Sequence, residues 1–93
     1  MSKNPHIIII MVDPLAAQAL SLYGNPVCKT PHLNELANQG IVFENAYSNN
    51  PVCVPSRASM LSGMLCPEIS AYDNATELPS SVPTMAHYMR SLG

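Results

Sequence analysis

Residues 53–57 (CVPSR) are the part of the chain whose types and spacing could carry out covalent chemistry. Pro55 predicts a helix start, because proline fits the first helical position, where its missing N–H is not needed. Cys53 would then lie beside free backbone N–H groups at the positive end of the helix dipole, which attracts anions and activates a thiol. Arg57 follows four residues later, so its guanidinium could reach the same turn and bind an oxyanion through two hydrogen bonds.

A purely structural role for these two residues competes with this interpretation. Free cysteine is among the most often buried residue types, and an arginine one helical turn away is commonly a solvated surface charge. The spacing alone therefore leaves both interpretations of Cys53 and Arg57 open.

The motif continues to Gly63, and residues 53–63 (CVPSRASMLSG) resemble the type I sulfatase signature, C-x-P-S-R-x-x-x-L-[TS]-G. The stretches from Tyr72 to Ala75 and from Ser80 to Tyr88 resemble the choline-sulfatase branch in particular. Further resemblance follows the family's order over nearly the whole chain, at Ile7–Asp13, Leu22–Pro26, Thr30–Leu33 and Phe43–Tyr47. We therefore expect residues 1–93 to be the N-terminal fragment of a sulfatase catalytic domain.

The resemblance implies roles for four residues. Cys53 corresponds to the cysteine that sulfatases convert to formylglycine, whose hydrate supplies a hydroxyl nucleophile that attacks sulfur. Arg57 would hold the deprotonated diol, and Asn74 would bind the sulfate through its amide. Asp13 matches the family's first metal-binding aspartate, and with the modified Cys53 it would bind Ca²⁺, or else Mg²⁺ or Mn²⁺, as a Lewis acid. From position alone, Asp13 could instead cap a helix and Asn74 could be a turn residue.

Two positions depart from the family pattern. Pro14 stands where many sulfatases have a second aspartate, so one metal ligand is missing or comes from elsewhere, and Met64 replaces a frequent arginine. Asp13 and Cys53 supply two protein ligands, against the about six to eight oxygens usual for Ca²⁺. The lysines, the histidines and the metal-binding Asp-Asn pair that come late in the sequences of the family are absent from these 93 residues. We therefore expect these 93 residues to be inactive on their own.

Three functions fit these observations. The first is hydrolysis of a small sulfate ester, with a formylglycine-generating maturation enzyme as the protein partner. The second is hydrolysis of a phosphonate or phosphate monoester within the same alkaline phosphatase superfamily. The third is a non-catalytic product, either a truncated remnant or a small interaction module, in which Cys53 remains a thiol. The sequence assigns no oligomeric state.

The elements that would position these residues follow an α/β pattern. Ile7–Val12 is a continuous run rich in β-branched residues, which predicts a strand covered on both faces in a largely parallel sheet. Ile41–Tyr47 predicts a second strand, and residues 64–83 a loop. Helices are expected over Leu15–Leu22, from Thr30-Pro31 to Gly40, from Pro55 to Gly63, and in a last segment bearing Met85, Met89 and Leu92. This order is that of an alkaline-phosphatase-like sandwich, a sheet flanked by helices, left incomplete in this chain.

The composition excludes several classes of partner. Apolar residues make up 47% of the chain against 11% charged, and the net charge is -2. We therefore expect no nucleic-acid or membrane binding, poor solubility from uncovered apolar faces, and, without a secretory signal, a cytoplasmic location. The three cysteines have irregular spacing, which favours reduced thiols, with Cys28 and Cys66 at least half-buried. The histidines, His6, His32 and His87, lack metal-ligand spacing and receive no role.

Overall fold

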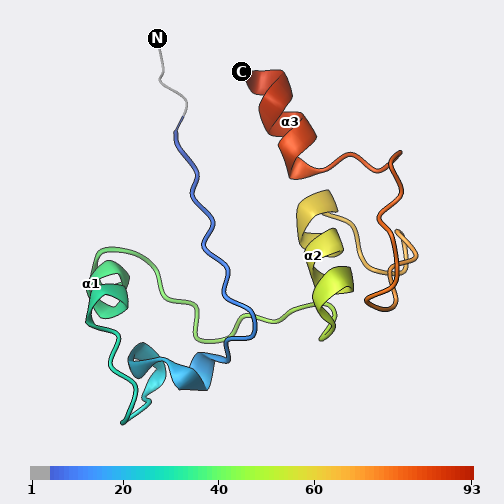
Figure 1. Ribbon diagram of the computed structural model, residues 1–93. Coiled ribbons are helices and arrows are strands. Elements are labelled where there is room, and N and C mark those ends of the chain that lie inside the picture. Colours follow the sequence, from blue (N-terminus) through green and yellow to red (C-terminus); the bar gives the residue numbers. More distant parts are fainter. Residues whose placement is uncertain (1–4) are drawn as a thin grey trace. The chain divides into compact units, whose positions relative to one another are not determined.

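The computed structural model describes residues 5–93, and the chain divides into two compact units. Unit 1 is Met1–Asn45 and unit 2 is Ala46–Gly93. Unit 1 holds two short 3-10 helices and one α-helix, and unit 2 holds two α-helices (Figure 1). In chain order these are η1 (Ala17–Ala19), η2 (Ser21–Tyr23), α1 (Pro31–Gln39), α2 (Cys53–Ser62) and α3 (Met85–Leu92).

Residues 7–12 are extended but form no sheet, in contrast to the predicted strand. Figure 1 shows them as the extended blue segment of unit 1. Side chains on both sides are exposed, with 82% of Ile8 and 53% of Ile9 accessible to solvent. A strand requires a neighbour whose backbone groups pair with its own, and residues 5–93 contain no such neighbour. The second predicted strand, Ile41–Tyr47, is likewise irregular, with a bend at residues 44–45.

The helix predicted over Leu15–Leu22 is replaced by η1 and η2. Leu20 lies between them in an extended conformation, with φ -95° and ψ 140°, so the two turns cannot join into one α-helix. Gly24 ends η2 with φ 92°, a left-handed conformation that glycine adopts without a Cβ clash. The run of Leu and Ala residues gives local helical turns, but no partner buries them as a longer helix.

The predicted helix after Thr30 is confirmed as α1, with Pro31 in its first turn and Gly40 at its end. Ser21 in η2 connects to this helix start. Its hydroxyl lies 2.6 Å from Thr30 Oγ1 and donates to Asn34 Oδ1 at 3.1 Å. Polar contacts therefore hold η2 against α1, where the described residues offer no buried apolar core.

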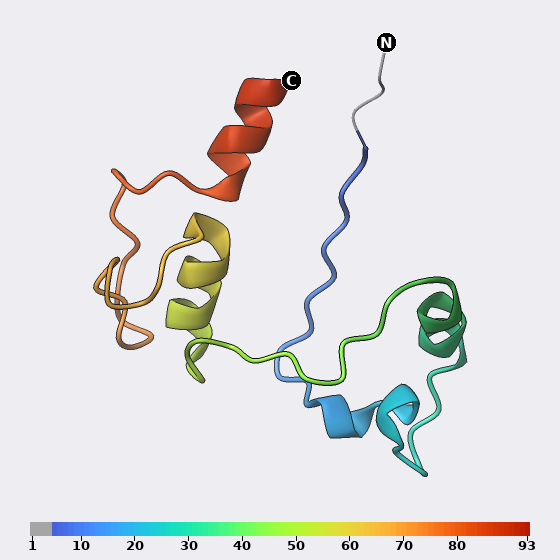
Figure 2. The same ribbon diagram turned by 180° about the vertical axis from the view of Figure 1, so that it is seen from behind.

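Unit 2 packs around α2, which confirms the helix predicted from Pro55 to Gly63 but begins two residues earlier, at Cys53. Pro55 is tolerated at the third helical position, because N–H groups in the first turn have no partner within the helix. Residues 64–83 form the predicted loop, which runs beside α2 before reaching α3 (Figure 2). The buried core comprises Ala58, Ile69 and Ala71, flanked by Met64, Leu78 and Val82.

The predicted last helix is confirmed as α3, and it contacts α2. Its start carries a cap that was not predicted from the sequence. His87 Nδ1 accepts the Thr84 N–H at 3.0 Å and lies 2.8 Å from Thr84 Oγ1. The imidazole thus takes the place that glutamate or glutamine has in a capping box.

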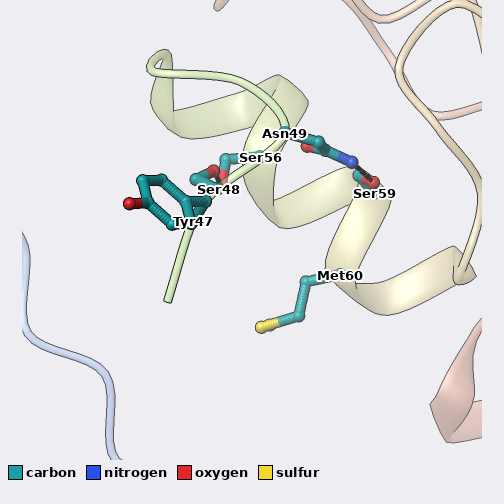
Figure 3. A pocket seen from close by; sticks show the side chains of 6 residues that line it. All are labelled: Tyr47, Ser48, Asn49, Ser56, Ser59 and Met60. Atoms are coloured by element: carbon teal, nitrogen blue, oxygen red, sulfur yellow. Dashed lines mark hydrogen bonds between the residues drawn. The ribbon is translucent and has the colours of Figure 1, made fainter. Parts of the chain in front are cut away.

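A polar network ties the segment before α2 to the body of that helix. The Ser59 hydroxyl, in a residue only 7% exposed, accepts a hydrogen bond from Asn49 Nδ2, shown as a dashed line in Figure 3. It also donates to the Met64 carbonyl at 2.5 Å. The opposite end of the amide, Asn49 Oδ1, accepts from the buried Cys66 thiol at 3.6 Å, and this thiol also reaches the Pro55 carbonyl at 3.4 Å. The network therefore fixes the backbone on both sides of the α2 start.

Because the apolar side chains of residues 7–12 are exposed, we expect the 93-residue chain to self-associate. Replacing Ile8 and Ile10 together by glutamate should raise the concentration at which the chain stays monomeric by about tenfold, because charge opposes pairing of open strand edges. Analytical ultracentrifugation measures this. Ser80→Glu with Ser81→Glu adds the same charge in an exposed loop, and an equal gain from this control pair would contradict the prediction.

Removing the Ser59 hydroxyl should destabilise unit 2. Ser59→Ala leaves the Asn49 amide and the Met64 carbonyl without this partner, which costs about 1–3 kcal/mol. Urea unfolding, followed by circular dichroism in the chain carrying the Ile8→Glu and Ile10→Glu changes, measures the loss. Ser80→Ala, which removes a hydroxyl from the exposed loop of the same unit, is the control and should stay within about 0.5 kcal/mol. Equal losses in both variants would show that the network adds no stability.

Candidate active site

Cys53 is the first residue of α2, and its thiol is exposed. The preceding residue, Val52, is extended, with φ -96° and ψ 140°. Its N–H donates to Asn50 Oδ1 at 2.8 Å, and its carbonyl accepts the Ser56 N–H at 3.1 Å. The backbone that carries Cys53 is therefore held on both sides, at the positive end of the helix dipole.

Asn74 lies at the same end of α2, although it comes 20 residues after Val54 in the chain. Its Oδ1 accepts the Val54 N–H at 3.0 Å. Because the partner is an N–H donor, Oδ1 must be the acceptor, and the NH₂ end of the amide keeps its protons for another acceptor. The turn conformation expected as the alternative is also present, since Asn74 lies in a turn. The structure thus brings Asn74 beside the turn that begins with Cys53.

The first turn of α2 has fewer available backbone donors than predicted from the sequence. The Val54 N–H is bound to Asn74, Pro55 has no N–H, and the Ser56 N–H is bound to Val52. The expectation of free N–H groups beside Cys53 is therefore wrong at these three positions. Donors for an anion at this helix end must come chiefly from side chains.

Arg57 lies one turn after Cys53 in α2, and both residues are exposed. Residues four apart share one face of a helix, so the observed helix meets the spacing that an anion clamp beside Cys53 requires. The Ser56 hydroxyl between them lies 2.9 Å from Ser48 Oγ, in the segment before the helix. The structure therefore gathers Cys53, Arg57 and Asn74 within unit 2, and their chemical roles stay predictions.

A hollow of about 380 Å³ lies between the segment before α2 and the side of that helix (Figure 3). Met60, which lines it, is two turns after Cys53, so the hollow adjoins the face that carries the thiol. Its lining includes hydroxyl and amide groups but no charged side chain, so it is not an anion site by itself. The lining residues are Tyr47, Ser48, Asn49, Ser56, Ser59 and Met60.

Asp13 belongs to unit 1, in a turn with Pro14 that follows the extended segment. The peptide bond between these two residues is cis. Within residues 5–93, no three histidine, cysteine, aspartate or glutamate side chains cluster to hold a metal ion. One carboxylate and a modified Cys53 give too few donors for a hard divalent cation, so these residues do not make a complete metal centre.

The other two cysteines differ from each other in exposure. Cys66 is buried, as predicted, whereas Cys28 is exposed, and that part of the prediction is wrong. Asn25 Oδ1 accepts the N–H groups of Val27 and Cys28 at 2.9 and 2.7 Å. This loop is thus held by its backbone and does not bury the thiol. None of the helices found in residues 5–93 has the length and apolar character that crossing a membrane requires.

Comparison with known proteins finds relatives that resemble nearly all of this chain. A choline-sulfatase of Rhizobium meliloti is 40% identical over 97% of the chain and 18% of its own length. An N-acetylglucosamine-6-O-sulfatase of Bacteroides thetaiotaomicron is 36% identical over 99% of the chain and 16% of its length. An ulvan-active sulfatase of Formosa agariphila is 39% identical over 97% and 18%. The chain thus spans less than one fifth of each of these relatives.

No solved structure matches the chain significantly. The family model described as Sulfatase matches residues 5–93, which include the exposed segment, the motif on α2 and the turn that carries Asn74. With this match over nearly its whole length, the chain belongs to the sulfatase family.

Proposed function

We propose that this chain is the N-terminal part of the catalytic domain of an enzyme that hydrolyses small sulfate esters. The observation that carries the proposal is the start of α2, where Cys53 and Arg57 are one turn apart and Asn74 is bound to the Val54 N–H. Membership of the sulfatase family supports this use of the three residues. Arg57 and the NH₂ group of Asn74 supply donors for a tetrahedral anion at a helix end where few backbone donors are left.

Cys53 is proposed as the residue that a maturation enzyme converts to formylglycine. Formylglycine at this position supplies, as its hydrate, a hydroxyl nucleophile and a second hydroxyl from which sulfate can be expelled. The exposure of Cys53 and the fixed backbone around it suit a residue that must meet a substrate in one orientation. Arg57 would bind anionic oxygens through its guanidinium, and Asn74 would donate to a sulfate oxygen.

A divalent cation, Ca²⁺ by resemblance, is proposed to act as a Lewis acid when bound. Asp13 and the modified Cys53 are its proposed ligands from this chain. Because they offer too few donors, the proposal requires further ligands from residues outside 5–93. It also implies that these 93 residues alone are inactive.

A sulfatase domain implies an alkaline-phosphatase-like fold. We propose that Ile7–Val12 and Ile41–Tyr47 become strands of a largely parallel sheet when the rest of such a domain is present. The exposure of isoleucine side chains on both sides of the first segment supports this, because a central strand of a parallel sheet is covered on both faces. The cytoplasmic location expected from the sequence stays a prediction.

The conversion of Cys53 is tested by co-expressing the chain with a formylglycine-generating enzyme and analysing its peptides by mass spectrometry. We expect the peptide containing residue 53 to lose its thiol, gain an aldehyde and react with a hydroxylamine probe. Cys53→Ala should give no such product, and Cys66→Ala, which alters a buried thiol, should leave conversion intact. An unmodified thiol at residue 53 under these conditions would favour the non-catalytic alternative.

Arg57 is tested by kinetics of the full-length enzyme on a sulfate ester. Arg57→Ala should lower kcat/KM by about 100-fold or more, a loss typical of a group that stabilises charge in the transition state. Arg57→Lys should recover only part of this, because an ammonium group cannot bind two oxygens as a planar fork. Arg90→Ala removes the same charge from exposed α3 and should stay within about twofold.

The same assay on a phosphonate monoester separates the two enzyme hypotheses. Sulfate and phosphonate esters present similar tetrahedral oxygens to Arg57 and Asn74. A higher kcat/KM on the sulfate ester is expected. Faster turnover of the phosphonate would assign the enzyme to that substrate class instead.

A further inference from the structure

The turn that carries Asn74 is closed by two side chains, that of Asp73 before Asn74 and that of Thr76 after it. Asp73 Oδ1 accepts the Ala75 N–H at 2.9 Å and the Thr76 hydroxyl at 3.0 Å. Thr76 Oγ1 in turn accepts the N–H groups of Tyr72 and Asp73, each at 3.4 Å. Residues 73–76, called the Asn74 turn below, are therefore held by hydrogen bonds among themselves.

The Thr76 hydroxyl has a central place in the Asn74 turn, because it donates to a carboxylate and accepts from the backbone at once. Thr76 is half-buried, whereas Asp73 and Asn74 are exposed. Before the turn in the sequence, Ala71 is only 1% exposed and belongs to the core of unit 2. After the turn, Leu78 packs against that core. The turn is thus anchored at both ends, and Asn74 projects from it to α2.

We infer that Asp73 and Thr76 are positioning residues that hold the Asn74 amide against the first turn of α2 and so direct its NH₂ group toward the sulfate ester. This inference rests on the proposed function. Asn74 Oδ1 is bound to the Val54 N–H. The direction of the Asn74 NH₂ group, at the other end of the planar amide, therefore depends on where the turn places the Asn74 Cα. An exposed asparagine on an unconstrained loop would lose this direction and would have to be ordered by the substrate.

The test uses the full-length enzyme with Thr76→Val, which keeps the shape but removes the hydroxyl, and Thr76→Ser, which restores it. Inorganic sulfate is the probe, because its inhibition constant reports anion binding without chemistry. Thr76→Val should raise the inhibition constant and KM by about tenfold, the effect expected from the loss of one hydrogen bond. The kcat should stay within about threefold of that of the unmodified enzyme. Thr76→Ser should return both to within about twofold of the unmodified enzyme.

Hydrogen exchange of the Val54 amide provides a readout independent of activity. Thr76→Val should accelerate it, and Thr76→Ser should not. Thr84→Val, which removes a hydroxyl at the start of α3, is the matched structural control and should change neither the sulfate constant nor the exchange at Val54. If Thr76→Val changed them no more than Thr84→Val does, the inference would be overturned.

Asn74→Ala separates failure of the inference from failure of the proposed role of Asn74. A rise in the inhibition constant for Asn74→Ala without one for Thr76→Val overturns only the positioning by Thr76. An unchanged constant for Asn74→Ala overturns the sulfate-binding role and the inference together, while conversion of Cys53 and the effect of Arg57→Ala would still stand as tests of the enzyme.

Discussion

A helix begins with N–H groups that have no partner inside it, and the way α2 meets this requirement organises unit 2. The Val54 N–H is bound by a side chain 20 residues later, the Val52 N–H is bound by Asn50 Oδ1, and Pro55 has no N–H. The chain on both sides of the helix is therefore drawn to one end of it. Cys53 and Arg57 of the sulfatase motif lie one turn apart at this end of the helix.

A second set of hydrogen bonds, centred on Asn49 and Cys66, ties the segment before α2 to that helix. Asn49 uses both ends of its amide, one to Ser59 on α2 and one from Cys66 after it. Pro55 is almost fully buried, and its carbonyl receives the same thiol. The exposed Cys53, the proposed precursor of the nucleophile, thus lies on a first turn in which Val54 is hydrogen-bonded and Pro55 is buried. This combination of a rigid base and an exposed tip is what a preorganised site needs.

Local signals in the sequence predicted α1, α2 and α3 but not the region Leu15–Leu22, where two 3-10 helices replace the expected helix, and the predictions that depend on distant segments failed. Proline and glycine mark the ends of α1, and Gly63 ends α2 with φ 72°, so neighbouring residues sufficed for these elements. Ile7–Val12 was predicted as a strand from its β-branched content, yet pairing depends on another segment, which residues 5–93 do not contain. The prediction of the sheet therefore concerned a larger domain than the one described.

The same difference between local and non-local signals applies to the candidate site. Cys53 and Arg57 could be placed on one helical face from their spacing alone, and Asn74 came only from resemblance. Nothing in the spacing indicated that Asn74 would bind the Val54 N–H, because a contact across 20 residues leaves no periodic pattern. Thr76 was missed for a related reason. Its hydroxyl acts within a turn, and sequence alone does not separate a threonine that closes a turn from one that merely follows it.

The Asn74 turn also has a consequence for how the protein is produced. Asn74-Ala75-Thr76 has the form of an N-glycosylation acceptor, in which a sugar is attached to the amide nitrogen. That nitrogen is the end of the side chain opposite the bond to Val54. In a host that exports the chain through a glycosylating compartment, an oligosaccharide would stand at the start of α2, beside Cys53. A host that attaches no sugar to this sequence leaves the Asn74 amide unmodified.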